Sequence, residues 1–280
     1  MLDIADNTPV VSIVAPTCNR ANLLKKMVDS VLTQSYQLWE LIVVDDISTD
    51  NTEAMMNEYS KKDARIKYYR IPVDKEPGIT KYLNYGLEVA KGKYISRLDD
   101  DDYWMDNDVL KIQVEFLDSH ADYIVVGGAA IIVNENGDHL FKYTKCEKDE
   151  DIRNNALMAN PFVHTTAMFR KDVVMSIGGY ANLPYAEDWD LWLKLGKIGK
   201  MYNFQRHFTC YLSAGQNTSF IKQRPQSREI LRIIKKYRKD YPKYAKGFLL
   251  NSTQYFYSFL PKSFKLRFHS FMIYLKRNYF

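Results

Sequence analysis

Apolar residues in the first 120 positions alternate between short continuous runs and stretches with helical spacing. The runs Val10–Ala15, Leu41–Val44 and Tyr94–Leu98 are typical of strands that helices bury on both faces. Between the first two runs, apolar residues recur every three or four positions from Leu23 to Leu32, which predicts an amphipathic helix. Three further helices are expected: one that begins near Asp50, one over Ile79–Ala90, and one that follows a cap at Asp106 or Asn107. A further strand is expected over Arg65–Arg70. This alternation favours a mainly parallel, doubly wound α/β sheet.

The pattern after residue 120 is more mixed and predicts a hairpin. Tyr123–Val133 and His139–Tyr143 are rich in strand-forming residues, and Asn136-Gly137 between them is typical of a tight turn. Further along, the sequence predicts a strand over His164–Phe169 and a short helix over Glu187–Leu195. This part of the chain is therefore expected to be less regular than the first part.

Length and composition are those of an ordinary globular protein. The 280 residues are 46% hydrophobic and 26% charged, which suits two average domains or one large α/β domain with a tail. No apolar run approaches the roughly 20 residues that span a bilayer, and the N-terminal residues do not resemble a signal peptide. The three cysteines, Cys18, Cys146 and Cys210, lack metal-binding spacing and favour a reducing compartment, the cytoplasm.

Charge is unevenly distributed between the C-terminal segment and the rest of the chain. The net charge is +5, yet residues 221–280 hold 15 Lys and Arg against two acids, Glu229 and Asp240. The same segment holds 14 aromatic residues and two stretches with helical apolar spacing, Ile230–Tyr237 and Phe264–Leu275. We therefore expect a basic, aromatic-rich helical extension with a role of its own.

Acidic residues directly follow two of the predicted strands. Asp99–Asp102 come after Tyr94–Leu98, and Asp45 and Asp46 come after Leu41–Val44; open α/β sheets bind ligands at this carboxyl edge. Two unit charges about 5 Å apart repel by roughly 3 kcal/mol at an effective dielectric constant of about 20. Four adjacent carboxylates therefore need solvent, protonation, a helix N-terminus or a cation such as Mg²⁺ or Mn²⁺. Taken alone, an exposed acidic turn before a helix explains each cluster at least as well.

Four segments, in this order, resemble the motifs of family 2 glycosyltransferases. They are Val11–Arg20 (VSIVAPTCNR), Gln34–Asp50 with its Asp45-Asp46 pair, Leu83–Asp102 with a D-x-D, and Glu187–Trp192 (EDWDLW). Each motif alone is weak, but four in series over roughly residues 9–215 are specific. The resemblance implies the GT-A fold, a Rossmann-like, mainly parallel sheet flanked by helices, and transfer of a sugar with inversion from a nucleotide-sugar. It divides the chain into a catalytic domain, residues 1–220, and the tail, residues 221–280; donor binding falls in about 9–102 and acceptor binding in about 103–220.

On the donor side, the resemblance places the D-x-D at Asp99 and Asp101, which would bind Mn²⁺ or Mg²⁺, with Asp101 the first choice. The cation would neutralise the diphosphate as it leaves. Asp45 or Asp46 is expected to contact the base, and Asp100 is expected to lie near the ribose or diphosphate together with Asp99. The other residues expected at the nucleotide-sugar are Pro16, Thr17, Asn19, Arg20, Asn84 and Arg97. Arg97 points to the same sheet face as Asp99, and it would either bind phosphate or pair with a neighbouring aspartate.

On the acceptor side, the resemblance makes Asp188 the general base. Inverting transfer needs one carboxylate to take the proton of the acceptor hydroxyl; alternatively, Glu187 and Asp188 only begin a helix, where acids are favoured. Glu187, Trp189 and His164 are expected at the acceptor. Trp189 would stack on an acceptor sugar, whereas core packing explains the neighbouring Trp192 at least as well, and the alternative for His164 is a structural role.

Three departures from the family pattern limit these assignments. Cys18 stands where many relatives carry an aromatic residue that stacks on the base, which puts uracil as the base in doubt. A UDP-sugar is still the first expectation for the donor, with the base left open. The segment Cys210–Ser219 lacks the histidine found there in many relatives, which leaves a third metal ligand unassigned. No Q-x-x-R-W motif follows Asp188, which favours transfer of a single sugar over processive synthesis.

The expected acceptor is a glycan or a lipid-diphosphate-linked sugar, as in bacterial surface-polysaccharide assembly. Residues 221–280 would then contact an anionic membrane surface on the inner face of the cell membrane, or else pack on the catalytic domain or form a homodimer contact. A rival interpretation is a non-catalytic protein that binds membrane or nucleic acid through this basic tail. Nucleic acid is not expected as a partner, because the rest of the chain is acidic and carries no nucleic-acid-binding motif. A dehydrogenase or nucleotidylyltransferase is disfavoured because Pro16–Arg20 contains no glycine.

Overall fold

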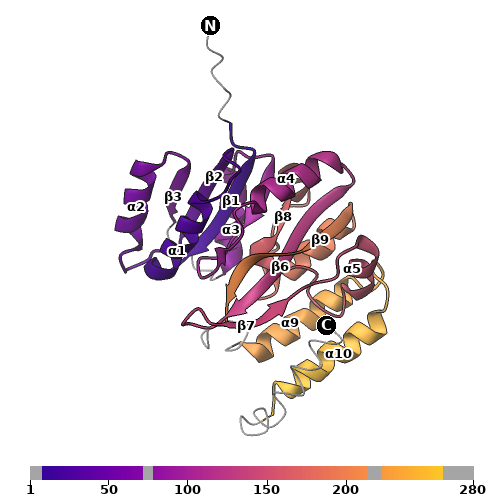
Figure 1. The fold of residues 1–280 in the computed structure, drawn as a ribbon. Helices are drawn as coiled ribbons and strands as arrows, with labels where there is room; N and C mark the ends of the chain where they lie inside the picture. The colour runs from indigo at the N-terminus through magenta and orange to yellow at the C-terminus, as the bar shows by residue number, and fades with distance from the viewer. Residues whose placement is uncertain (1–7, 72–77, 214–221, 261–280) are drawn as a thin grey trace.

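The structure, a computed structural model, describes residues 8–71, 78–213 and 222–260. In its first half, four parallel strands alternate with helices, as the sequence predicts (Figure 1). They are β1 (Val11–Thr17), α1 (Ala21–Leu32), β2 (Trp39–Asp45), α2 (Thr52–Lys62), β3 (Ile66–Arg70), α3 (Ile79–Val89) and β4 (Tyr94–Arg97). Every residue of β1 and β2 is buried, because helices cover both faces of these strands.

The second half extends the same sheet with strands of both directions. Its elements are β5 (Tyr103–Trp104), α4 (Val109–Ser119), β6 (Tyr123–Val133), β7 (His139–Tyr143), α5 (Asp149–Asn155), the 3₁₀-helix η1 (His164–Thr166), β8 (Met168–Arg170), α6 (Lys171–Ser176), α7 (Glu187–Gly196) and β9 (Lys200–Leu212). β8 pairs antiparallel with both β4 and β6, whereas β6 and β9 are parallel. The nine strands lie in the order β3-β2-β1-β4-β8-β6-β9-β5, with β7 paired to β6 in the predicted hairpin.

Two local predictions for this half are wrong. The strand expected over His164–Phe169 is a 3₁₀ turn followed by β8, because the backbone N–H of Ala167 bonds back to the carbonyl of His164 at 3.1 Å. The N-cap position of helix α4 is Asp108 rather than Asp106 or Asn107, and the Asp108 side chain makes no capping hydrogen bond. The Asp106 carboxylate instead accepts the backbone N–H of Asp108 at 3.0 Å and closes the turn before the helix.

Alternate residues of the parallel strands face two separate apolar clusters. On one face, Ile13 and Val43 pack in a cluster with Leu24 of α1 and Leu110 of α4. On the other face, Val14 belongs to a cluster with residues of α3 and α7: Leu83, Leu87, Leu191 and Trp192. The sheet is thus held between two helical layers, and its carboxyl edge stays open for ligands.

The C-terminal segment begins with two helices, α9 (Gln223–Lys236) and α10 (Tyr244–Tyr257), which lie side by side below the sheet in Figure 1. Ile233 and Ile234 of α9 are buried in the same cluster as Trp192 of α7. The first amphipathic stretch predicted in this segment is therefore helical and packed on the α/β unit. The second, Phe264–Leu275, lies outside the described residues. In the part of the chain that the structure describes, no helix is long and apolar enough to cross a membrane.

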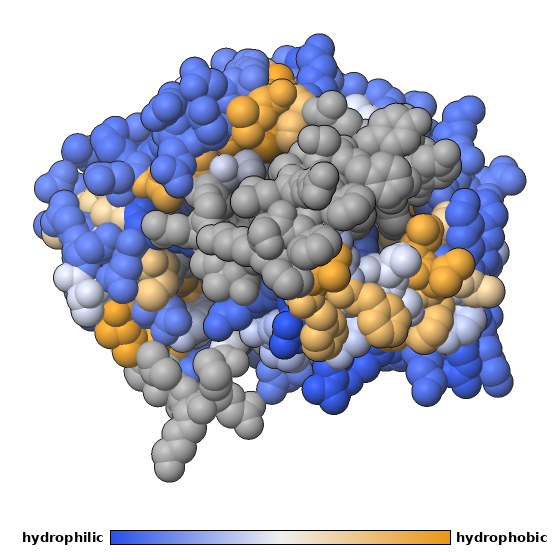
Figure 2. Space-filling model, turned by 90° about the horizontal axis from the view of Figure 1, so that it is seen from below, coloured by the Kyte–Doolittle hydropathy of each residue, from blue (hydrophilic) through white to orange (hydrophobic). Residues whose placement is uncertain are grey.

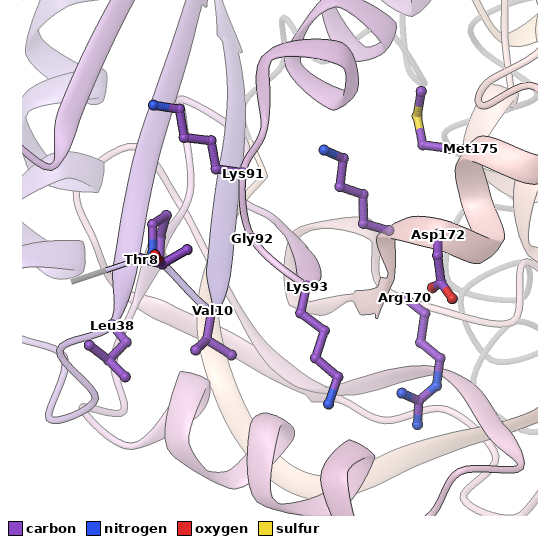
Figure 3. A pocket seen from close by; sticks show the side chains of 11 residues that line it. Thr8, Val10, Leu38, Lys91, Gly92, Lys93, Arg170, Asp172 and Met175 are labelled. Carbon is purple, nitrogen blue, oxygen red and sulfur yellow. The ribbon is translucent and has the colours of Figure 1, made fainter. Parts of the chain in front are cut away.

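A cavity of about 810 Å³ lies at the edge of the sheet where β1 and β4 begin, beside Val10 and Lys93 (Figure 3). Three of the four basic side chains that line it, those of Lys93, Arg170 and Lys171, are bonded within the fold. Lys93 Nζ lies 2.5 Å from Asp118 Oδ1, and the Arg170 guanidinium donates to the carbonyl of Leu117 at 2.6 Å. This cavity lies at the opposite edge from the acidic strand ends, and we assign it no part in the chemistry below.

Candidate active site

A cavity of about 720 Å³ lies at the carboxyl ends of β1 and β4. The residues of the first half that line it include Pro16, Arg20, Asp99, Asp100 and Asp101. Those of the second half include Asn160, His164, Glu187, Asp188 and Trp189. The fold therefore brings predicted donor-side and acceptor-side residues, far apart in the sequence, into one cavity.

The acidic run after β4 is held in place by the loop that follows β1. Thr17 Oγ1 donates to Asp100 Oδ2 at 2.7 Å. One nitrogen of Arg20 lies 3.0 Å from Asp100 and 2.9 Å from Asp101. Four of the residues that the sequence places on the donor side are thus joined across the sheet edge, and the Arg20 guanidinium is partly exposed between the carboxylates.

Arg97 is completely buried and organises the other side of the acidic run. Its guanidinium forms an ion pair with Asp99 and donates to the carbonyl oxygen of Val14. Its Nε lies 3.1 Å from Nε2 of His164. Of the two alternatives that the sequence left open, phosphate binding and pairing with an aspartate, the structure has the pair.

Five carboxylates line the cavity, against three cationic side chains: Arg20 and Lys145, which also line it, and Arg97, which pairs with Asp99. Burial would raise the pKa of Asp99, but Arg97 outweighs it and the pKa is lowered. Burial raises the pKa of Asp101 to about 7, with the charges of Asp99 and Asp100 adding to the effect. Burial, with the charge of Asp188, raises the pKa of Glu187 to about 8. Such groups take up protons or a cation near neutral pH.

This donor set fits a hard divalent cation that is only partly ligated by protein. Asp99 and Asp101 both line the cavity and each engages an arginine through one oxygen, Oδ1 and Oδ2 respectively. Among the described residues no group of three acidic, histidine or cysteine side chains is arranged to hold a metal ion. Mg²⁺ and Mn²⁺ commonly take one or two carboxylates and fill their remaining positions with phosphate oxygens and water.

The second acidic pair, after β2, does not line this cavity. Asp45 is completely buried and accepts hydrogen bonds from Ser48 Oγ at 2.5 Å and Tyr68 OH at 2.6 Å. It therefore fixes the turn after β2. Asp46 accepts a hydrogen bond from the Tyr82 hydroxyl and is only half-buried. Of the two aspartates expected at the base, Asp46 is the one that a ligand can reach.

Two further residues expected at the donor are engaged in the scaffold. Asn19, in the left-handed region with φ 54°, accepts the backbone N–H of Thr49 at 2.7 Å and so ties the loop after β1 to the loop after β2. The Asn84 side-chain amide exchanges two hydrogen bonds of 2.9 Å with the backbone of Tyr180. Neither side chain lines the cavity. Their placement favours positioning roles over direct contact with the donor.

Asp188 is oriented by two hydrogen bonds from different parts of the chain. Its Oδ2 accepts from Nδ2 of Asn160 at 2.6 Å, and its Oδ1 accepts the backbone N–H of Trp189 at 2.7 Å. Ala186, directly before the two acids, has φ 57°, a conformation that favours glycine. Strained backbone of this kind often occurs at functional sites. The carboxylate is thus presented at the start of α7 with its direction fixed.

His164 is held as a neutral ring with its proton on Nδ1. Nε2 receives the Nε–H of Arg97 at 3.1 Å and lies 2.9 Å from the Tyr180 hydroxyl. Because a guanidinium only donates, Nε2 must be the acceptor. Burial and the charge of Arg97 lower the pKa of His164 to about 4. His164 lines the cavity, so it offers a hydrogen-bond donor there without a charge.

The two tryptophans of α7 differ in their access to the cavity. Trp192 is completely buried and packs edge-on against Phe162 and Phe169. Trp189 is 5% exposed, and its Nε1 donates to the carbonyl of Ala156 at 2.8 Å. Trp189 lines the cavity but presents only a small part of its ring, so core packing accounts for most of its surface.

Several residues in and around the cavity were not predicted from the sequence. Asn160 and Tyr180 orient Asp188 and His164, and Tyr211 lines the cavity from the end of β9. The residues of α9 and α10 that line it are Gln223, Gln226, Ser227, Ile230 and Gln254. Asn160 lies four residues before His164, but no local pattern pairs an amide with a carboxylate 28 residues away.

Comparison with known proteins agrees with this arrangement. The family model described as Glycosyl transferase family 2 matches residues 12–178. The chain is similar to the glycosyltransferase EpsE of Bacillus subtilis strain 168, with 33% identity over 202 residues covering 70% of each chain. It is also similar to the amylovoran biosynthesis glycosyltransferase AmsE of Erwinia amylovora, with 30% identity over 63% of this chain and 65% of AmsE.

Solved structures share the fold at low identity. Staphylococcus aureus TarS 1–349 in complex with UDP-GlcNAc is 20% identical and has a TM-score of 0.64, over 89% of this chain and 73% of TarS. The mannosyltransferase PcManGT from Pyrobaculum calidifontis, in complex with GDP-Man and Mn²⁺, is 20% identical with a TM-score of 0.62, over 87% of this chain and 69% of PcManGT. The expected GT-A type of α/β fold is thereby confirmed.

Proposed function

The chain belongs to glycosyl transferase family 2 and is an enzyme of that family; from this premise we propose that it is a metal-dependent, inverting glycosyltransferase. It moves a single sugar from a nucleotide-sugar to a hydroxyl of a glycan or of a lipid-linked acceptor. One observation carries the proposal: Asp188, oriented by Asn160, lines the same cavity as Asp99, Asp100 and Asp101.

Asp188 serves as general base in this proposal. Its carboxylate takes the proton of the acceptor hydroxyl while that oxygen attacks the anomeric carbon from the face opposite the leaving group. The bond from the anomeric carbon to the diphosphate breaks in the same step, so the configuration inverts. The bond from Asn160 keeps one oxygen of Asp188 in place at 2.6 Å during this transfer. His164 offers its Nδ1–H to a sugar hydroxyl, and Glu187 and Trp189 complete the acceptor side.

Asp99 and Asp101 are the residues that would hold Mn²⁺ or Mg²⁺. When bound, the cation supplies charge neutralisation for the leaving diphosphate. Arg20 adds a partly exposed positive charge beside Asp100 and Asp101. Arg97 keeps Asp99 ionised, because the buried Arg97 guanidinium forms an ion pair with the Asp99 carboxylate.

The donor is a nucleotide-sugar, with a UDP-sugar as first choice. The structural neighbours TarS and PcManGT are described with UDP-GlcNAc and with GDP-Man, which supports the donor class while leaving the base open. In this proposal Asp46, half-buried after β2, accepts N–H groups of the base. Pro16 and Arg20 line the cavity where the ribose and diphosphate would lie.

The donor assignment is tested by calorimetric binding of UDP-, GDP- and dTDP-sugars with Mn²⁺, with Mg²⁺ and with EDTA. We expect one donor to bind only in the presence of the cation. In the variant Asp101→Asn, the cation should no longer promote binding of this donor. Asp172→Asn, an exposed aspartate in the first turn of α6, is the matched control and binds as the wild type does. Equal binding of all donors with and without cation would refute the proposal.

We place the enzyme in surface-polysaccharide assembly, next to the membrane. AmsE is named for amylovoran biosynthesis, which supports the pathway class. The outer face of α10 and the turn after it expose large apolar side chains: Phe248, Leu249, Phe256, Phe259 and Leu260. Hydrophobic side chains gather on the lower face of the molecule (Figure 2), and the segment that carries these residues is strongly basic. Apolar groups beside Lys and Arg suit an anionic membrane surface.

Co-sedimentation with vesicles tests the membrane contact. We expect binding to phosphatidylglycerol vesicles and little binding to phosphatidylcholine vesicles. The double variant Leu249→Ser/Phe256→Ser, which removes side chains that are 66% and 69% exposed, should lose most of it. The control Leu140→Ser/Ile198→Ser alters apolar residues that are 51% and 50% exposed elsewhere. Equal loss in both double variants would show that general surface hydrophobicity is responsible.

A further inference from the structure

The C-terminal helices form one wall of the cavity. Gln223, Gln226, Ser227 and Ile230 of α9 and Gln254 of α10 line it together with Asp188. We call these five residues the glutamine wall. All of them lie beyond residue 178, where the family match ends. The basic segment that follows the catalytic motifs is therefore part of the cavity itself.

The chemistry of the glutamine wall differs from that of the segment that carries it. Residues 221–280 are strongly basic, and Arg224 and Arg228, on the same turns of α9, are exposed. The wall, in contrast, contains three amides, one hydroxyl and one apolar side chain, and no charged group. A diphosphate or an anionic headgroup would be met by Lys or Arg. Neutral amides that both donate and accept are suited to the hydroxyl groups of a sugar.

The wall is fixed to the elements that carry the proposed base. The completely buried Asp190 of α7 accepts from Lys236 Nζ at 2.7 Å and from Tyr237 OH at 3.0 Å. The Tyr241 hydroxyl donates to the carbonyl of Leu193, also in α7, at 2.8 Å. Helix α9 is thereby tied to the helix on which Asp188 lies.

Helix α10 is tied to the segment just before Asn160. Asn251 Nδ2 donates to the carbonyl of Leu157 at 3.2 Å. Gly247 lies so close that a Cβ at its position would come within 2.4 Å of the Leu157 carbonyl oxygen. Both helices are thus held against the segments that supply and orient Asp188, which fixes the distance between the wall and the base.

We propose that the glutamine wall is the subsite for the acceptor sugar and takes an uncharged, hydroxyl-rich saccharide. This inference rests on the proposed function, because Asp188 defines which side of the cavity the acceptor occupies. Arg20 and the acidic run come from the ends of β1 and β4 and face the diphosphate, whereas the wall is joined to α7. The amides of Gln226 and Gln254 would select the acceptor through its hydroxyl pattern.

The test observes the glutamine side chains directly in the full-length protein. The chain has eight glutamines, so selective ¹⁵N-glutamine labelling gives a simple spectrum of side-chain amides. The variants Gln226→Ala and Gln254→Ala assign the two signals. The probes are UDP with Mg²⁺, followed by the methyl glycosides of glucose, galactose, mannose and N-acetylglucosamine.

We expect the glycosides, added after UDP and Mg²⁺, to shift the signals of Gln226 and Gln254. The signal of the completely buried Gln113 serves as the internal control and should stay in place. With the best glycoside as acceptor, each alanine variant should raise the acceptor KM by about 3- to 10-fold, the loss expected for one hydrogen bond. The donor Kd should not change. Arg228→Ala and Thr253→Ala, on the exposed faces of the same helices, should leave both constants unchanged.

The possible outcomes separate the two proposals. If nucleotide-sugars bind with metal but no glycoside moves the Gln226 and Gln254 signals, the acceptor subsite is elsewhere and this inference is wrong. If the alanine variants change the donor Kd as much as the acceptor KM, the wall belongs to the donor site. If glycosides shift the wall signals while no nucleotide-sugar binds, the saccharide subsite stands and the transferase proposal fails.

Discussion

The two sides of the active-site cavity are built on different principles. On the donor side, Asp99, Asp100 and Asp101 are engaged in ion pairs with Arg20 and Arg97. On the acceptor side, the Asp188 carboxylate accepts only neutral donors among the described residues, and the glutamine wall is uncharged. The first arrangement is adapted to a ligand with formal charge, and the second to a ligand with hydroxyl groups.

The difference has consequences for stability as well as for binding. A buried charge is costly unless a partner compensates it, so removal of one partner from a buried ion pair is strongly destabilising. A neutral hydrogen bond contributes about 1 kcal/mol, and its loss changes binding more than folding. Mutations on the donor side should therefore act on the fold and the cation together. Mutations on the acceptor side should act mainly on turnover or acceptor affinity.

The largest expected effect is on the acceptor side, where one carboxylate carries the proton transfer. Asp188→Asn keeps the shape and a hydrogen bond to Asn160 but cannot accept a proton. General-base catalysis contributes about 10²- to 10⁴-fold, so we expect kcat to fall by about 10³-fold with the donor Kd unchanged. The measurement is steady-state transfer together with calorimetric donor binding, with Asp172→Asn as control. A loss of donor binding equal to the loss of kcat would place Asp188 on the donor side.

The second prediction compares two aspartates that form ion pairs with basic side chains, one from each side. Arg97→Met leaves Asp99 without its buried guanidinium partner, and we expect the free energy of unfolding to fall by about 3 kcal/mol or more. Lys236→Met removes a half-exposed partner from Asp190, which keeps its ion pair with Lys194 and its hydrogen bond from Tyr237. A loss of about 1 kcal/mol is therefore expected. Urea unfolding monitored by circular dichroism measures both. Equal losses in the free energy of unfolding would mean that the ion pairs beneath the two sides contribute equally to stability, so that the two sides differ only at the cavity surface.

The donor side could be predicted from sequence because its information is local. A buried parallel strand shows as a continuous apolar run, as in Val11–Ala15, and the residues after such a strand lie at the carboxyl edge of the sheet. The position of Asp99–Asp101 follows from that rule, and so does the helical character of α1 and α3. The pairing of Arg20 with Asp100 did not follow, because the spacing of 80 residues carries no periodic signal.

The acceptor side could be predicted only in part, because distant segments assemble it. Glu187 and Asp188 were found through the resemblance, but Asn160 and Tyr180 act through side-chain contacts that no local pattern encodes. The segment at His164 was expected to be a strand because its residues favour one. Tertiary hydrogen bonds instead form a 3₁₀ turn: Thr166 Oγ1 donates to the Val163 carbonyl at 2.8 Å and accepts the N–H of Gly128 at 3.0 Å. Tertiary context overrides local preference there.

The third prediction concerns the pH dependence of the donor side. Burial raises the pKa of Asp101 to about 7, so below pH 7 this group is protonated and a cation must displace the proton. Affinity for Mn²⁺ in the presence of UDP should therefore rise about tenfold per pH unit below pH 7 and level off above it. Titration calorimetry between pH 5.5 and 8.5, in steps of about half a unit, measures this. Asp101→Asn should remove most of the slope, and an unchanged slope in that variant would assign the proton to another group.

The smallest expected effect concerns His164, where the two sides meet. Burial and Arg97 lower its pKa to about 4, from an ordinary value of 6.5. The unfolded chain thus takes up this proton at a higher pH than the folded chain. The neutral ring therefore stabilises the fold fully above pH 6.5, and this contribution is lost as the pH falls toward 4.

Tyr180→Phe tests that account, because it removes a hydroxyl 2.9 Å from Nε2 and leaves Arg97 in place. The neutral ring loses one hydrogen bond, so the pKa of His164 should rise toward 6.5, by about one pH unit or less. Proton-detected ¹⁵N NMR of the histidine ring measures both the pKa and the tautomer. At pH 7 the wild type should carry its proton on Nδ1, and the variant should keep this tautomer because the guanidinium of Arg97 still requires an acceptor at Nε2. A proton found on Nε2 in the wild type would contradict the assignment of Nδ1–H as the hydrogen-bond donor toward the acceptor sugar. His164 would then be a purely structural residue between Arg97 and Tyr180.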